Sequence, residues 1–178
     1  MPWGSCDRGT AVGRRDFAIM LLLSRLGLRI GEVAALRLDD LDWRAGELAV
    51  CGKGSRQERL PLPVDVGEAI AAYLRRGRPR DAAVREVFLR VTPPQVALTR
   101  GGVTALVAGA ARRAGLGVVR AHRLRHTAAT DMLRAGAPLA EIGQVLRHRS
   151  PGSTASYARV DVERLRTIAR PWPTGTES

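Results

Sequence analysis

The sequence predicts a mostly helical α+β domain with a small antiparallel sheet, and three observations lead to this prediction. Several segments place apolar residues at helical spacing. Two short apolar segments are joined by a glycine-rich loop, which is typical of a β-hairpin. The 178 residues are 45% hydrophobic, which is enough to bury the core of one compact domain. This composition argues against fibrous and disordered classes.

The first part of the chain predicts two helices separated by a glycine. From Arg14 to Leu26 the apolar residues cluster at helical spacing, and Asp16 lies in the first turn. Gly27 is the expected C-terminal stop of this helix. We expect a second helix from Ile30 to Leu36, after which residues 41–43 lead into a turn at 44–46.

The middle of the chain predicts the sheet. Residues 47–51 and 58–62 are expected to be strands, joined by a hairpin loop that includes 52–55. An amphipathic helix follows at 64–76, and residues 87–89 are the candidate for a third short strand.

The C-terminal half predicts only helices, which makes helix the dominant element of the fold. The expected ranges are 102–114, 122–135, 138–146, 153–159 and 161–169. For domain organisation we expect a ragged segment at 1–13, one domain at 14–170 and a disordered tail at 171–178.

The charge of the chain predicts a polyanionic partner. It has 29 basic and 17 acidic residues, a net charge of +12, which favours nucleic acid first and an anionic membrane surface second. The basic residues are 28 arginines and one lysine, Lys53. A coding bias explains the excess of arginine, so the one lysine that remains indicates a position where arginine does not serve.

Cysteine usage and the N-terminus predict a soluble cytoplasmic protein. Cys6 and Cys51 are too few for a disulfide framework, which suits a reducing compartment. The first ten residues do not have the pattern of a secretory signal. The longest apolar stretch, Ala18–Leu23, is far shorter than the roughly 20 residues that span a membrane.

The three histidines lie close together in the sequence, and Tyr157 follows the last of them by nine residues. Each of these residues taken alone is more often structural than functional. His122 and His126 have the i, i+4 spacing of zinc ligands on a helix. Arg123 and Arg125 lie between them and would repel a dication, and the spacing lacks the glutamate of a HExxH motif. We therefore expect no metal.

The same region suits the binding of an anion. His122 and Arg125 share a helix face, and His122 lies at the helix start, where the dipole favours phosphate. Arg29 and Glu32 are also three residues apart, so Glu32 would hold Arg29 in one orientation. Together with Lys53 these side chains favour one phosphate site, because the planar fork of arginine donates two parallel hydrogen bonds to phosphate oxygens.

Four separated segments make this interpretation specific. They are Leu26–Val33, Gly52–Gly54, His122–Thr127 and Leu146–Ser150, the last followed by Tyr157. In order and in spacing they resemble the catalytic domain of the tyrosine recombinases, the phage integrase family. The resemblance covers residues 14–160 and implies the fold of that domain, a helical bundle with a three-stranded antiparallel sheet.

The resemblance also implies the roles of individual residues. It implies that Tyr157 is the nucleophile and that Glu32 supports the first catalytic arginine. The other catalytic residues that it implies are Arg29, Lys53, His122, Arg125 and His148. We expect Arg56, Arg147 and Arg149 to contact the DNA. The implied partner is double-stranded DNA, with self-association on DNA through the helix at 161–169, no cofactor and a location at the nucleoid.

The chemistry of phosphate transfer agrees with these roles. A free tyrosine hydroxyl has a pKa of about 10 and is a poor nucleophile at neutral pH, so a basic pocket and a proton acceptor such as His122 are needed. Preorganised donors on Arg29, Arg125 and His148 would stabilise the charge of the pentacoordinate state. Lys53 would protonate the leaving 5′ oxygen, a role for which arginine is too weak an acid.

Two departures from the family pattern leave other functions open. Arg147 replaces the glycine that usually precedes the late histidine, and we expect no N-terminal DNA-clamping domain ahead of Arg14. The main hypothesis is a site-specific DNA recombinase that acts through a 3′-phosphotyrosine. The alternatives are a truncated remnant that binds DNA without recombining it, an enzyme that relaxes DNA like a type IB topoisomerase, and a basic helical protein whose spacings are coincidental.

Overall fold

The computed structural model describes residues 6–51, 57–117 and 121–134, together with Gly136, Ile142 and Leu146. Within α5 the side chains of Ala121 and His122 lie outside this description. The chain divides into two compact units, Met1–Ala128 and Ala129–Ser178.

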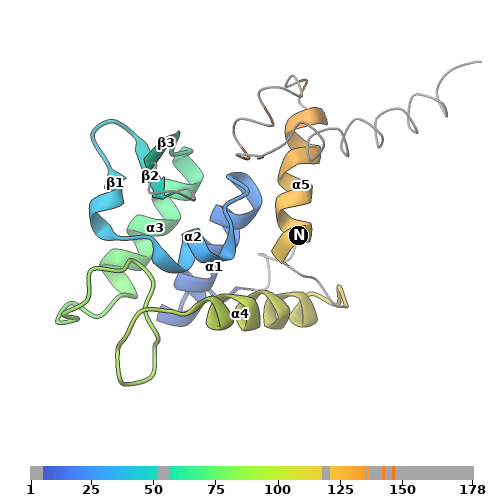
Figure 1. Ribbon diagram of the computed structural model, residues 1–178. Coiled ribbons are helices and arrows are strands. Elements are labelled where there is room, and N and C mark those ends of the chain that lie inside the picture. Colours follow the sequence, from blue (N-terminus) through green and yellow to red (C-terminus); the bar gives the residue numbers. More distant parts are fainter. Residues whose placement is uncertain are drawn as a thin grey trace, which may run out of the picture. The chain divides into compact units, whose positions relative to one another are not determined.

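The described chain is mostly helical with a small three-stranded antiparallel sheet, which confirms the predicted fold class (Figure 1). In the first unit α1 packs against α3, α2 and α4, so it is the central helix. The elements in chain order are α1 (Ala11–Arg25), α2 (Ile30–Ala35), the short helix η2 (Leu38–Asp40), β1 (Leu41–Asp42), β2 (Glu47–Cys51), β3 (Gln57–Pro61), α3 (Val64–Arg76), α4 (Arg100–Arg113) and α5 (Ala121–Arg134).

Local caps explain where α1 begins and ends. The hydroxyl oxygen of Thr10 accepts a hydrogen bond from the Gly13 N–H at 3.0 Å, so the helix begins at Ala11, three residues before the predicted start. It ends at Arg25, and Gly27 follows with a φ of 58°. This left-handed conformation favours glycine, which confirms the predicted stop.

The sheet has the order β1-β2-β3, and both pairs of strands are antiparallel. Leu48 in the central strand pairs with Leu41 on one side and with Leu60 on the other. All three leucines are buried, so this row of side chains fixes the register of the sheet against the core. The two strands of the predicted hairpin are confirmed to within one residue.

The prediction of a third strand at 87–89 is wrong, because the third strand is β1. Residues 87–89 are buried, but they extend between two other segments and form only isolated bridges. The Val87 N–H donates to the carbonyl oxygen of Leu36 at 2.8 Å, and the Leu98 N–H donates to that of Phe88 at 2.8 Å. The segment was apolar enough for a strand, but its neighbours in space are not the strands of the hairpin.

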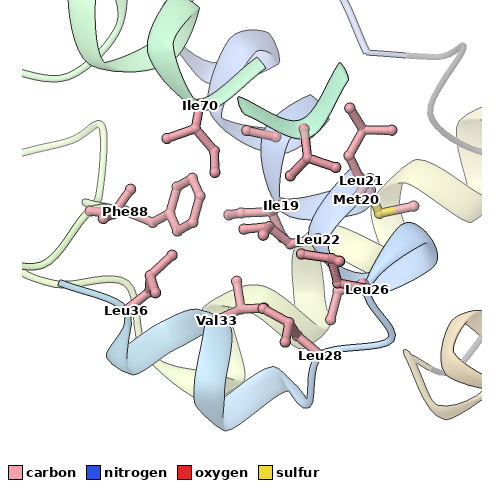
Figure 2. Packing of buried hydrophobic residues seen from close by; sticks show 14 of the residues in the cluster. Ile19, Met20, Leu21, Leu22, Leu26, Leu28, Val33, Leu36, Ile70 and Phe88 are labelled. Atoms are coloured by element: carbon pink, nitrogen blue, oxygen red, sulfur yellow. The ribbon is translucent and has the colours of Figure 1, made fainter. Parts of the chain in front are cut away.

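The hydrophobic core of the first unit surrounds α1 (Figure 2). Ile19 and Leu22 are fully buried and face side chains from α2, α3 and the segment around Phe88. In Figure 2 the ring of Phe88 lies between Ile70 and Leu36. This core fixes the end of α1 and the start of α2, the region that carries the first predicted site residue.

The remaining helices agree with the sequence pattern. α3 has its predicted bounds, and α5 begins one residue before its predicted start. α4 begins at Arg100, two residues before its predicted start, because the hydroxyl oxygen of Thr99 accepts from the Gly102 N–H at 3.2 Å.

In the second unit Ala129, Ile142 and Leu146 form a small buried cluster, against which Met132 and Leu133 pack. The predicted helices at 153–159 and 161–169 lie outside the described residues, as does most of 138–146. Within the described part of the chain, no helix has both the length and the apolar character needed to cross a bilayer.

Candidate phosphate site

The connection between α1 and α2 positions Arg29. Gly27 turns the chain at the end of α1, and the buried Leu28 anchors the connection with its N–H donating to the Leu22 carbonyl oxygen at 3.3 Å. Arg29 follows in an extended conformation as the N-cap of α2. Its side chain is 45% exposed, so this residue next to the core is accessible to solvent.

Glu32 holds Arg29 in place, as the spacing of the two residues predicts. One carboxylate oxygen of Glu32 accepts from the Arg29 backbone N–H at 2.7 Å, and the other accepts from Nη1 of Arg29 at 2.8 Å. The first bond is the backbone half of a capping box, so the same carboxylate stabilises the helix start and orients the guanidinium. The side chain of Glu32 is only 8% exposed, which protects this ion pair from solvent more than an ordinary surface pair.

Arg125 reaches the same connection from α5. Its Nη1 donates to the carbonyl oxygen of Gly27, a residue 98 positions away in the sequence and two before Arg29. Arg125 is 7% exposed, the only arginine in the described chain that is buried. Two of the arginines predicted for the phosphate site are therefore brought to one loop, one of them buried and the other half-exposed.

The burial of Arg125 costs free energy of hydration. Removing a guanidinium from water costs several kcal/mol unless charged or polar groups compensate for the lost hydration. The Gly27 carbonyl supplies one such group, and an anion at the loop would supply opposite charge. A phosphate would therefore find donors that are already oriented and partly dehydrated, the condition under which donors stabilise developing negative charge most.

The structure adds Arg100 to this neighbourhood, a residue that the sequence does not predict for the site. It begins α4, and its guanidinium lies against Gly31 in the first turn of α2. A methyl group at position 31 would lie 2.8 Å from Nε of Arg100, closer than such contacts allow. Only the packing of α2 against α4 brings these residues together, so the sequence offers no local signal for the contact.

Tyr73 has a structural role. It is 1% exposed, its ring stacks on Phe88 with centroids 5.6 Å apart, and its hydroxyl oxygen accepts from the Leu89 N–H at 3.3 Å. Burial raises the pKa of Tyr73. A hydroxyl that is buried and held in this way is not available to attack a DNA phosphate.

Several predicted site residues lie outside the described chain. For His122 the backbone is described, and it places the residue in the first turn of α5, three positions before Arg125. This arrangement agrees with the predicted shared helix face. The other predicted site residues outside the described chain are Lys53, Arg56, Arg147, His148, Arg149 and Tyr157.

Comparison with known proteins gives the family of the chain. A family model described as the phage integrase family matches residues 6–164. The integrase/recombinase y4rA of Sinorhizobium fredii, as it is named, is 51% identical over 172 residues, which are 95% of this chain and 42% of that protein. Another Sinorhizobium fredii protein named as an integrase/recombinase, y4gC, is 43% identical, over 94% of this chain and 88% of that protein.

More distant relatives are named as tyrosine recombinases. XerC of Bifidobacterium longum is 35% identical, over 89% of this chain and 47% of the relative. The chain thus spans less than half the length of y4rA and of this XerC, and most of the length of y4gC.

Solved structures have the same fold. The XerA recombinase matches with a TM-score of 0.76 and 25% identity, over 89% of this chain and 58% of that one. The XerH site-specific recombinase, in a post-cleavage complex with its palindromic difH substrate, matches with a TM-score of 0.79 and 22% identity, over 94% of this chain and 49% of that one. With the family model over most of its residues and a relative that is 43% identical over nearly its whole length, the chain belongs to the phage integrase family, the tyrosine recombinases.

Proposed function

We propose that this chain is the catalytic part of a site-specific DNA recombinase, which breaks and rejoins double-stranded DNA through a 3′-phosphotyrosine intermediate. The observation that carries the proposal is the meeting of Arg29 and Arg125 at one loop, with Glu32 fixing the first arginine. Membership of the phage integrase family supports this function over a chance arrangement of basic residues.

In the proposed reaction the hydroxyl oxygen of Tyr157 attacks the phosphorus of a DNA phosphodiester while His122 accepts its proton. The bond from phosphorus to the 5′ oxygen breaks, and Lys53 gives that oxygen a proton. Arg29, Arg125 and His148 donate hydrogen bonds to the phosphate oxygens as negative charge builds up. The product keeps the bond energy in a phosphotyrosine, so attack by a 5′ hydroxyl of another strand rejoins the DNA without ATP.

Tyr73 supports the assignment of the nucleophile to Tyr157. The sequence has two tyrosines, and the one in the described chain is buried with its hydroxyl engaged by the backbone of Leu89. If a tyrosine of this chain forms the covalent bond, we infer that it is Tyr157.

The proposal includes contacts beyond the reacting phosphate. We assign to Arg56, Arg147 and Arg149 contacts with the DNA, and to the segment 161–169 self-association of copies on the DNA. A stripe of Val162, Leu165, Ile168 and Ala169 in that segment would form the contact between copies. DNA as the substrate would place the protein at the nucleoid.

A nicked suicide duplex tests the proposal, because cleavage next to the nick releases a short fragment and traps the covalent adduct. The chain should form an adduct, and Tyr157→Phe should abolish it while DNA binding stays close to that of the wild type. Tyr73→Phe is the matched control and should still form the adduct. Adduct formation by Tyr157→Phe would contradict the assignment, and failure of the wild type to form any adduct would favour the remnant that only binds DNA.

A further inference from the structure

A second basic surface lies outside the phosphate site, in a groove between α1 and α3. The groove has a volume of about 650 Å³. Phe17 and Leu21 of α1 and Ala69 and Ala72 of α3 form its apolar floor. The charged residues along it are Arg8, Arg14, Arg25, Arg75 and Arg76, with Asp65 and Glu68.

The shape of this surface follows from the spacing of its residues. On α1 the lining positions 14, 17, 21 and 25 recur every three or four residues, which is one face of a helix. The facing stretch of α3 contributes two alanines, whose small side chains leave a trough between the helices. From Arg14 to Arg25 the groove follows α1 for about 16 Å at 1.5 Å per residue, the length of three helical turns.

Two arginines of the groove, Arg14 and Arg25, make polar contacts within the fold. Arg25 pairs with Asp65 at 3.1 Å, and Arg14 donates to the carbonyl oxygens of Gly9 and Arg76 at 2.9 and 3.0 Å.

Three further arginines give the groove an excess of positive charge. Arg8, Arg75 and Arg76 are exposed and form no ion pair with any carboxylate of the described chain. The guanidinium of Arg8 lies 5.0 Å from the centroid of the Phe17 ring, so a cation borders the apolar floor directly.

We propose that the groove binds an acidic amphipathic helix of a partner protein. An apolar face of that helix would cover Phe17 and the alanines, and flanking carboxylates would pair with Arg8 and Arg75. The position of the groove between two helices and its length of about three turns suit a helix rather than a loop.

Charge and the apolar floor argue for this occupant over two others. A second copy of this chain carries a net charge of +12 and is a poor source of counter-charge. DNA has no apolar face that could cover the floor of the groove. A partner protein with carboxylates around an apolar stripe matches both the floor and the rim.

The test uses the full chain and a fluorescein-labelled synthetic helix of about twelve residues, with leucine and phenylalanine on one face and glutamate on the others. Binding is measured by fluorescence anisotropy without DNA. The double variant Arg8→Glu/Arg75→Glu should weaken binding by about tenfold or more, because it reverses two contacts at the rim. The control Arg44→Glu/Arg112→Glu makes the same change in net charge at exposed positions outside the groove and should have a much smaller effect.

A second variant tests the contribution of the apolar floor to peptide binding without changing the charge of the groove. Ala72→Trp fills the trough and leaves every arginine in place, so it should also weaken peptide binding by about tenfold if the apolar face enters the groove. Circular dichroism and the free energy of unfolding show whether the variant is folded. An equal loss in both double variants, or full binding by a folded Ala72→Trp protein, would overturn the proposal.

The two rival occupants are tested with the same proteins. If Arg8→Glu/Arg75→Glu weakens the binding of a DNA duplex more than the control does, the groove belongs to the DNA surface. If sedimentation shows a dimer that this variant dissociates and the control does not, the occupant is a second copy. Either result overturns the proposal, and neither depends on whether the chain forms a covalent DNA adduct.

Discussion

Replacing Glu32 with glutamine tests whether this carboxylate orients Arg29, because the substitution keeps the size of the side chain and removes its charge. The guanidinium of Arg29 would lose an ion pair of 2.8 Å whose side chains are 45% and 8% exposed. A hydrogen bond between charged groups contributes about 1.5–3 kcal/mol when shielded, and the half-exposed arginine reduces this to about 1 kcal/mol. A loss of about 1 kcal/mol from the transition state slows adduct formation roughly fivefold.

Asp40→Asn is the matched control for this variant. Asp40 accepts from the Arg37 backbone N–H at 2.8 Å, the same capping bond that Glu32 forms with Arg29, in the short helix η2 that carries no predicted site residue. Both substitutions should lower the free energy of unfolding by at most about 1 kcal/mol. Only the change at Glu32 should slow the reaction.

The assay is single-turnover adduct formation on the nicked duplex, with stability followed by urea unfolding and DNA affinity by anisotropy. Glu32→Gln should slow the adduct step at saturating DNA and leave the affinity close to that of the wild type. A rate equal to the wild type would refute the role of Glu32 in orienting Arg29. Equal slowing in Asp40→Asn would also refute it, because the effect would then follow stability rather than the site.

Arg100, the two cysteines and the net charge of the chain each give one further prediction. Gly31→Ala should displace the guanidinium of Arg100 at little cost in stability, so duplex binding measured by anisotropy should fall as far as in Arg100→Ala; unchanged binding would remove Arg100 from the site. Iodoacetamide should label the exposed Cys51 before the buried Cys6, because burial raises the pKa of the Cys6 thiol; mass spectrometry showing the reverse order would contradict its burial. These 178 residues should lose most of their duplex binding between about 50 and 200 mM salt, since phosphate contacts would supply the affinity; salt-resistant binding would contradict this.

The features that the sequence predicts well are those set by residues close together in the chain. Gly27 marks the end of α1, and α3 has the bounds that its apolar spacing indicates. The contact of Glu32 with Arg29 spans three residues on one helix and could be anticipated in the same way. In each case the helical period or the φ preference of glycine fixes the geometry before any tertiary contact forms.

The features that the sequence misses depend on segments that are distant in the chain. β1 is only two residues long, and its pairing with β2 depends on the turn between them rather than on an apolar run. Residues 87–89 have the composition of a strand, yet they bridge Leu36–Arg37 and Ala97–Leu98. Arg100 reaches Gly31 only because α2 and α4 pack together, a contact that local spacing cannot encode.

Arg125 combines a feature that the sequence predicts with one that it misses. The resemblance to the family selects Arg125 for its place in a motif, whereas its burial depends on α5 reaching a loop 98 residues earlier. Removing a guanidinium from water costs free energy, and the loop that receives Arg125 also carries the half-exposed Arg29. An anion that binds at this loop in the folded protein would stabilise the fold at the place where the chemistry is proposed. For this reason we expect phosphate binding at the loop 27–29 to raise the stability of the first unit as well as to serve the proposed reaction.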